Sequence, residues 1–242
     1  MDCKLNTLLF VAIFVAVSCG NYAFSQSPSG TTGSWLMFFN QTRLHEKWSL
    51  HAEAQYRSFE ISPNTEQILL RIGANFHINN NYSVSAGLAY VPNYAFDKEQ
   101  LPGVQVSEKR TWQKMIMKNK LGRVNFEHRY RLEQRWLQSN NSDKYLNRIR
   151  YLIRATFPLN KKAIEKNTLF LTLYDEVFIH FSSLPFDRNR LYAAVGYQVM
   201  PKSNVQLGYL AQTVNTTTKH YLQAAFFYNL DVRKNSATKI KQ

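Results

Sequence analysis

The stretch FEHRYRLEQRW, residues 126–136, alternates strictly between bulky and charged side chains. Its even positions include Phe126, Tyr130, Leu132 and Trp136, and its odd positions hold only Glu and Arg. A helix, with its period of 3.6 residues, would spread the two sets around its circumference, whereas a strand keeps them on opposite faces. The stretch therefore predicts a β-strand with one apolar face and one ionic face.

The same alternation recurs along most of the chain and divides it into eleven segments. The segments cover residues 34–43, 47–60, 67–77, 82–91, 112–121, 126–136, 145–157, 168–180, 188–199, 205–214 and 221–231. Turn-forming sequences such as HINNN and MPKSN separate them. Strands of soluble sheets commonly run about five or six residues, whereas a tilted strand needs about nine to eleven to cross a bilayer. The segment lengths therefore favour membrane strands.

Connection lengths and strand number define the expected fold further. LHE, INNN, LGR and PKSN are short, and the connections between them are mostly longer, with Pro92–Arg110 the longest. Short turns at one end and long loops at the other are typical of outer-membrane barrels. Residues 112–121 form the weakest segment because their Lys and Met residues alternate poorly. Because bacterial barrels have an even number of strands, the predicted fold is an all-β, antiparallel up-and-down transmembrane β-barrel of about 10 or 12 strands.

The beginning of the chain has the layout of a secretory signal peptide. The apolar segment Leu5–Val17 is too short to span a bilayer, and it precedes a small-x-small cleavage site at Ala23-Phe24-Ser25. A second interpretation is a lipid anchor on Cys19, because AVSCG loosely resembles a lipoprotein cleavage box. Cys3 and Cys19 both lie at or before the cleavage region, so we expect no disulfide in the mature protein.

Four regions follow from these boundaries. We expect a signal peptide at 1–25, an N-terminal lead at 26–33, the barrel at 34–231 and a basic C-terminal tail at 232–242. The expected location is the cell outer membrane.

The polar face of the predicted barrel is dominated by arginine. In a membrane barrel, apolar side chains face lipid and polar side chains face the interior, or lumen. We expect a lumenal ladder of ion pairs across neighbouring strands, because the planar guanidinium group suits carboxylates. The ladder comprises Glu53, Arg57, Arg71, Glu127, Arg129, Arg131, Glu133, Arg135, Arg148, Arg150, Arg154, Glu176, Arg188 and Arg190. In residues 168–180, either set of alternate positions can be the one that faces the lumen. Glu176 belongs to the ladder under one of these two assignments.

The composition is basic, with 30 Lys and Arg against 16 Asp and Glu. A basic excess often indicates nucleic-acid binding, but here the basic residues form no runs and alternate with apolar ones inside strands. We therefore expect no nucleic-acid partner. The expected partners are outer-membrane lipid, the barrel-assembly machinery and, if the lumen is open, a small anionic solute.

An ordered set of motifs resembles a known family. Gly33-Ser34-Trp35, KWSLHAEAQYR, RYRLEQRW, NRIRYLIR, LYDEVF, FDRNRLYAAVGYQV and NVQLGYLAQ occur in this order. Together they resemble the domain of unknown function 2490 proteins, exported β-barrels of Gram-negative bacteria, from Gly33 to the C-terminus. The resemblance implies a fold and a location but no reaction. The chain departs from such barrels at its end, since they often finish on an aromatic residue and this one continues from Asp231 to Gln242.

The sequence leaves four interpretations of function open. The favoured one is a closed or weakly conducting barrel, because barrels of about eight strands are filled by side chains and open channels belong to about sixteen or more. The second is a narrow channel for small anionic solutes, suggested by ten Arg against four Glu in the ladder. The third is an outer-membrane lipid-modifying enzyme, with His128, Gln134 and His220 as the polar residues to consider. The fourth is a soluble periplasmic lipid carrier with aromatic residues inside and arginines in water.

The motifs of common catalytic sites are missing from the sequence. It has no GxSxG, no HExxH, no cysteine pair in the mature region and no glycine-rich phosphate loop. We therefore expect no enzymatic activity, no metal and no cofactor.

Overall fold

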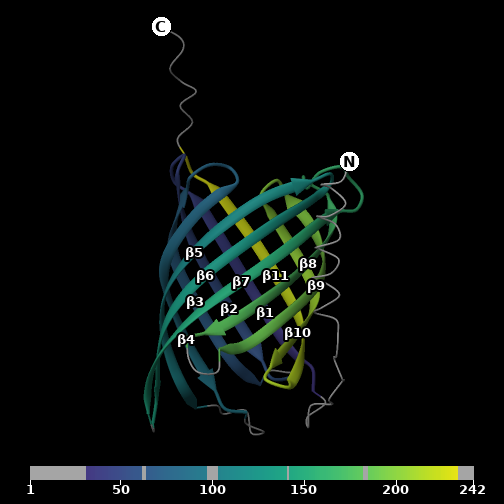
Figure 1. Cartoon of the computed structure of the whole chain (residues 1–242). Helices are drawn as coiled ribbons and strands as arrows, with labels where there is room; N and C mark the ends of the chain where they lie inside the picture. The colour runs from purple at the N-terminus through teal and green to yellow at the C-terminus, as the bar shows by residue number, and fades with distance from the viewer. Residues whose placement is uncertain (1–30, 62–63, 97–102, 141, 182–184, 234–242) are drawn as a thin grey trace, which may run out of the picture.

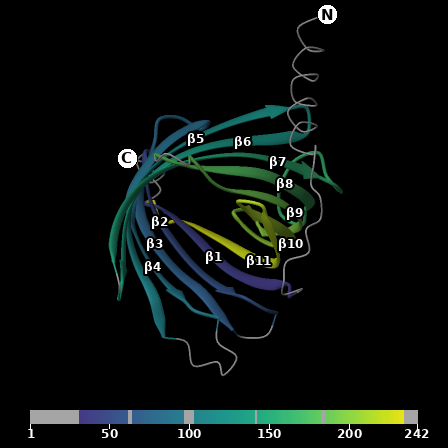
Figure 2. The ribbon, with the colours of Figure 1, turned by 60° about the horizontal axis from the view of Figure 1, so that its bottom comes forward.

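The computed structural model describes residues 31–61, 64–96, 103–140, 142–181 and 185–233. The strands are β1 (Gly33–Arg43), β2 (Trp48–Ser58), β3 (Thr65–His77), β4 (Tyr82–Tyr94), β5 (Val104–Leu121), β6 (Val124–Ser139), β7 (Asp143–Pro158), β8 (Leu169–His180), β9 (Phe186–Met200), β10 (Ser203–Val214) and β11 (Thr217–Asp231). Each pairs with the next along the chain, and together they close into a barrel (Figure 1, Figure 2). Among the described residues there is no helix of the length and apolarity that a membrane crossing requires. The predicted signal peptide, the alternative anchor at Cys19 and residues 234–242 of the predicted tail lie outside the described residues.

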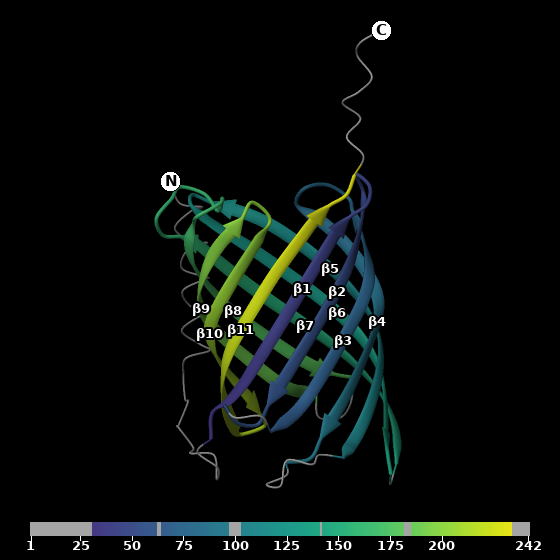
Figure 3. The same ribbon diagram turned by 180° about the vertical axis from the view of Figure 1, so that it is seen from behind.

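The predicted strand number of 10 or 12 is wrong, because the described barrel has eleven strands. An odd number of alternating strands brings the first and last together pointing the same way. β1 and β11 accordingly pair in parallel, from Gly33 opposite Tyr221 to Arg43 opposite Asp231, while the other ten pairs are antiparallel (Figure 3). The expectation of a wholly antiparallel barrel fails at this one seam.

The odd number also places the two chain ends of the barrel at opposite rims. We call the end where β1 begins the Gly33 rim and the end where β11 finishes the Asp231 rim (Figure 3). The connections at the Asp231 rim span 44–47, 78–81, 122–123, 159–168 and 201–202, and those at the Gly33 rim span 59–64, 95–103, 140–142, 181–185 and 215–216. The predicted contrast between short and long connections is therefore only partial, because 159–168 is long and 215–216 is short.

The segment Pro92–Arg110, predicted to be the longest loop, is strand at both of its ends. β4 continues to Tyr94 and β5 begins at Val104, with Pro92 paired to Ser107 and Val91 to Glu108. β5 keeps the period of two, but its outward side chains include Lys109, Thr111 and Gln113, so the hydrophobic contrast is weak.

The barrel has a polar interior and an apolar exterior. On β6, for instance, Glu133 is buried inside while Tyr130 and Leu132 are exposed outside. Glu176 shows which face of β8 points inward, because its side chain is buried and lines the interior. The soluble-carrier interpretation needed the aromatic and aliphatic face inside, so its assignment of the two faces is wrong.

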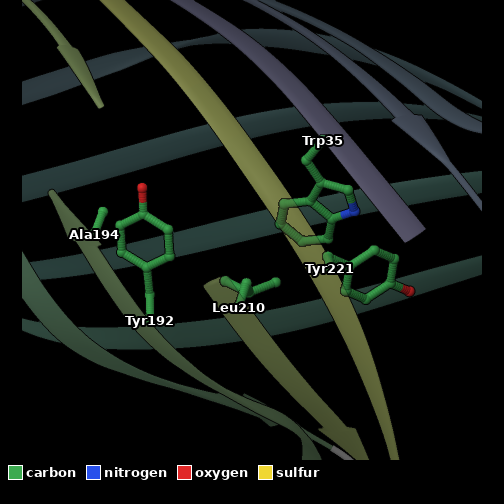
Figure 4. Packing of buried hydrophobic residues seen from close by; sticks show 5 residues of the cluster. All are labelled: Trp35, Tyr192, Ala194, Leu210 and Tyr221. Atoms are coloured by element: carbon green, nitrogen blue, oxygen red, sulfur yellow. The ribbon is translucent and has the colours of Figure 1, made fainter. Parts of the chain in front are cut away.

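An aromatic cluster lines the inside of the parallel seam. Trp35 of β1 packs on Tyr221 of β11 with ring centroids 4.9 Å apart, and Leu210, Tyr192 and Ala194 complete a buried group (Figure 4). Burial of this group stabilises the seam, where the parallel ladder itself is slightly weaker per residue than an antiparallel one.

Trp112 of β5 is fully buried inside the barrel because two glycines make room for it. Gly73 and Gly87 are directly paired across β3 and β4, and a Cβ on either would meet the Trp112 ring and neighbouring backbone. The indole Nε1 donates to the Leu88 carbonyl at 3.2 Å, which holds the ring over this gap.

Gly87→Ala is expected to lower the free energy of unfolding by about 1–3 kcal/mol, the usual cost of overpacking. Urea unfolding of the protein in detergent micelles, followed by tryptophan fluorescence, measures it. Gly103→Ala is the control, because no atom of the described residues lies within 4 Å of a Cβ added at Gly103. Equal unfolding midpoints for the two variants would contradict the packing described.

Candidate functional site

Glu133 lies at the centre of the charged interior. Its fully buried carboxylate accepts hydrogen bonds from Arg148 at 2.5 and 3.0 Å and from Arg150 at 2.8 Å, both on the neighbouring strand β7. Arg71 Nη2 and Arg131 Nη1 approach the same carboxylate to 3.8 and 3.9 Å. Arg71 belongs to β3, which is not adjacent to β6, so this contact reaches across the interior.

The network continues through Glu176 and Asp187. Glu176 accepts from Arg150 at 2.7 and 3.0 Å and from Arg129 at 2.9 Å. Arg148 also donates to Asp187 at 2.7 Å. Because each of Arg148 and Arg150 joins two carboxylates, the ion pairs form one continuous structure over β6, β7, β8 and β9.

Two further carboxylates extend the pairing on the side of β2 and β5. Glu108 accepts from Arg110 at 2.8 Å and from Arg135 of β6 at 3.1 Å, and Glu53 accepts from Arg71 at 2.5 Å. Bidentate and charge-assisted bonds of this kind are the strong ones in proteins. They hold the side chains in fixed positions across the interior.

The structure places all the residues predicted for the ladder on the interior face. Those that are buried are Glu53, Arg57, Arg71, Arg131, Glu133, Arg135, Arg148, Arg150, Glu176 and Arg190. The others are partly buried, and they include Glu127 and Arg154, which pair at 3.3 Å. The β6–β7 register brings Glu133 opposite Arg148 and Glu127 opposite Arg154, and both of these cross-strand pairs are ion pairs in the structure.

The buried charges do not balance. In the part of the chain that the structure describes, nine buried cations, Arg57, Arg71, Arg110, Lys114, Arg131, Arg135, Arg148, Arg150 and Arg190, face five buried acids, Glu53, Glu108, Glu133, Glu176 and Asp187. Within the described residues, four of these cations have no hydrogen-bonded carboxylate, namely Arg57, Lys114, Arg131 and Arg190. The imbalance is thus concentrated in identifiable side chains.

Aromatic rings lie beside the cations that lack a hydrogen-bonded carboxylate. The guanidinium carbons of Arg57 and Arg190 lie 4.0 and 4.8 Å from the centroid of Trp35. Lys114 Nζ and the guanidinium carbon of Arg131 lie 5.5 and 5.7 Å from the centroid of Trp112. Cation–π attraction offsets part of the cost of burying these charges.

Several charged residues of the interior were missed by sequence reasoning. Glu108 and Arg110 fell in the predicted loop, Lys114 stood in the weakest segment, and Asp187 lies where the β8–β9 register shifts. The even spacing of Glu108, Arg110, Trp112 and Lys114 is the signal that could have identified β5 as a lumen-facing strand.

The polar residues considered for an enzyme lie on the outer face and are hydrogen-bonded there. His128 Nδ1 is 2.9 Å from the Tyr151 hydroxyl, Gln134 accepts from Thr111 at 2.6 Å, and His220 contacts the Tyr209 hydroxyl. These contacts satisfy polar groups on an otherwise apolar surface. In the described part of the chain, no group of three or more His, Cys, Asp or Glu is placed to hold a metal ion.

Comparison with known proteins gives a family and no activity. The sequence profile of the family described as "Protein of unknown function (DUF2490)" matches residues 32–223. An uncharacterised protein of Methylorubrum extorquens AM1 is 29% identical over 171 residues, which cover 68% of this chain and 71% of that protein. The β domain of the Bordetella autotransporter BrkA aligns with a TM-score of 0.44 and 11% identity, covering 75% of this chain and 82% of the solved one. The family match spans most of the chain and includes ten of the strands and part of β11: this protein belongs to the DUF2490 family.

Proposed function

We propose that this protein is an integral outer-membrane β-barrel of Gram-negative bacteria whose lumen is closed by an Arg/Glu network. The observation that carries the proposal is the inverted distribution of polarity. Glu133 and Glu108 are 0% and 1% exposed, while Leu207, Ile72 and Leu88 on the outer face are 68%, 63% and 58% exposed. Monomeric proteins in water rarely expose apolar surface on this scale, whereas lipid is the natural solvent for it.

Strand length supports the same environment. The strands of the barrel run from 11 residues in β1 to 18 in β5. A tilted strand needs about nine to eleven residues to cross the hydrocarbon layer. Every strand is therefore long enough to span a bilayer, and closure leaves no unpaired strand edge facing lipid.

The interior supports a closed lumen over a wide pore. Eleven strands stand nearer to the roughly eight-stranded barrels that side chains fill than to the roughly sixteen-stranded porins. Arg71 from β3 reaches Glu133 on β6, so ion pairs cross the space that a channel would need. Breaking such contacts to admit a solute would leave buried charges unpaired.

The test is fractionation followed by a gel and by electrical recording. We expect the chain, expressed with its own N-terminal segment, to be recovered in the outer membrane and to migrate faster unboiled than boiled. In planar bilayers it is expected to give no sustained conductance. Recovery as a soluble periplasmic protein without a heat shift would overturn the membrane proposal, and a large steady conductance would overturn the closed lumen.

A narrow path for small anions is the second candidate. The excess of buried cations over buried acids favours it, since a positive lumen attracts anions. A small, anion-selective conductance that falls in Arg57→Gln would support this path.

A further inference from the structure

We propose that the lumen contains a binding site for a small oxyanion of the phosphate class, formed by Arg57 and Arg190 around Trp35. Both side chains are buried, and their guanidinium carbons lie 4.0 and 4.8 Å from the same indole centroid. Two cations are thus held beside one ring inside the barrel, and the Glu66 carboxylate is the acid that lines the same space on the side of Arg57.

Neither guanidinium group is neutralised by a hydrogen-bonded carboxylate in the described part of the chain. Arg57 donates to the amide oxygen of Gln55 at 2.5 and 3.2 Å, and Arg190 donates to that of Gln212 at 2.7 Å. The acid oxygen near Arg190 belongs to Glu176 and lies 3.9 Å away, and that carboxylate is already bonded to Arg150 and Arg129. Guanidinium N–H groups therefore remain for a further acceptor.

The same place has room for a small ligand. A cavity of about 210 Å³ is lined by Trp35, Arg57 and Arg190 together with the amide side chains of Gln55 and Gln212. That space is many times what one water requires, so a small oxyanion and its remaining water fit.

The chemistry of the donors selects the class of ligand. Planar guanidinium forks bind oxyanions with two parallel hydrogen bonds, and the pairing is strongest with phosphate and carboxylate groups. A tetrahedral phosphate offers enough acceptor oxygens for two forks, whereas chloride offers a single centre. The site depends on the interior geometry alone, so it does not rest on the membrane location or on conduction.

The experiment uses the folded full chain in detergent micelles and follows thermal unfolding by tryptophan fluorescence. Inorganic phosphate is titrated against sodium chloride at matched ionic strength. We expect phosphate to raise the unfolding midpoint saturably, by about 5–10 °C when the site is nearly full, and chloride to have little effect. The double variant Arg57→Gln/Arg190→Gln is expected to lose this response. It should still fold, because neither arginine is hydrogen-bonded to a carboxylate of the described residues.

Lys114→Gln is the matched control. Lys114 is equally buried and also lacks a hydrogen-bonded carboxylate among the described residues, but it lies over Trp112 and does not line this cavity. Its phosphate response should equal that of the unaltered protein. Equal responses in all three proteins, or equal effects of phosphate and chloride, would overturn the site.

A soluble phosphodiester, glycerophosphoglycerol, separates a free oxyanion from a lipid headgroup. If inorganic phosphate stabilises the protein, the ligand is a free oxyanion, as proposed. If only the phosphodiester stabilises it, the ligand is a lipid headgroup and the proposal of a free oxyanion is wrong. The heat shift on the gel is recorded without phosphate, so failure of the barrel proposal and failure of the anion site give different results.

Discussion

Glu133→Gln is expected to lower the free energy of unfolding by about 3–5 kcal/mol, the range for removing one partner of a buried ion pair. The amide keeps the shape of the side chain, so the change removes charge with little change in packing. Glu133 accepts three hydrogen bonds from Arg148 and Arg150, and Arg71 and Arg131 lie within 4 Å of it. Neutralising it leaves several buried guanidinium groups without their shared counter-charge. Urea unfolding in detergent micelles, with tryptophan fluorescence as the signal, gives the free energy.

Glu165→Gln is the matched control for that measurement. Glu165 pairs with Lys161 at 3.1 Å in the connection 159–168, and its side chain is 65% exposed. Exposed pairs contribute about 0–1 kcal/mol, so this variant should unfold almost as the unaltered protein does. A loss at Glu133 as small as the loss at Glu165 would mean that water reaches the interior network and screens it.

The fold was predictable where one face of a strand differs sharply from the other. In residues 126–136, every odd position holds Glu or Arg and most even positions hold a bulky apolar side chain, and the structure places this stretch in β6 with the ions inside. In β5 the outward positions include Lys109, Thr111 and Gln113, which reduces the contrast on which periodicity depends. Residues 104–110 of that strand were consequently taken for a loop.

The strand number failed for a different reason. Eleven segments were visible in the sequence, and the general preference for even strand numbers argued against them. That preference follows from antiparallel closure, in which first and last strands run in opposite directions. Here Trp35 and Tyr221, far apart in the sequence, pack together along a parallel seam. No local pattern in either strand encodes that pairing.

The charged site was predictable as a set of residues but only partly as a set of contacts. Strand parity alone places Glu133, Arg148 and Arg150 on the inner face. The contact from Arg71 to Glu133 depends on the diameter and tilt of the closed barrel, which the alternation of residues does not specify. The same holds for Asp187, which reaches Arg148 from the point where the β8–β9 register shifts.

The two chain ends of the barrel are expected to react on opposite sides of the outer membrane. β1 begins at one rim and β11 finishes at the other, so cysteines introduced by Thr32→Cys and Val232→Cys should lie on different faces. A membrane-impermeant maleimide added to intact cells should label one variant fully, and the other only after the outer membrane is opened. An even-stranded barrel would place both ends on the same side, because its first and last strands run in opposite directions.

Two turn positions make this assignment independent of the chain ends. Thr216→Cys lies in the connection 215–216 at the Gly33 rim and should label together with Thr32→Cys, whereas Asn80→Cys lies in 78–81 at the Asp231 rim and should label together with Val232→Cys. The unaltered chain measures any background from Cys3 and Cys19. Labelling of all four variants from outside would contradict a membrane-spanning barrel, since both rims would then face the same solution. Labelling of Thr32→Cys with Val232→Cys, but not with Thr216→Cys, would contradict the parallel seam, because only an even number of crossings returns the chain to the side from which it started.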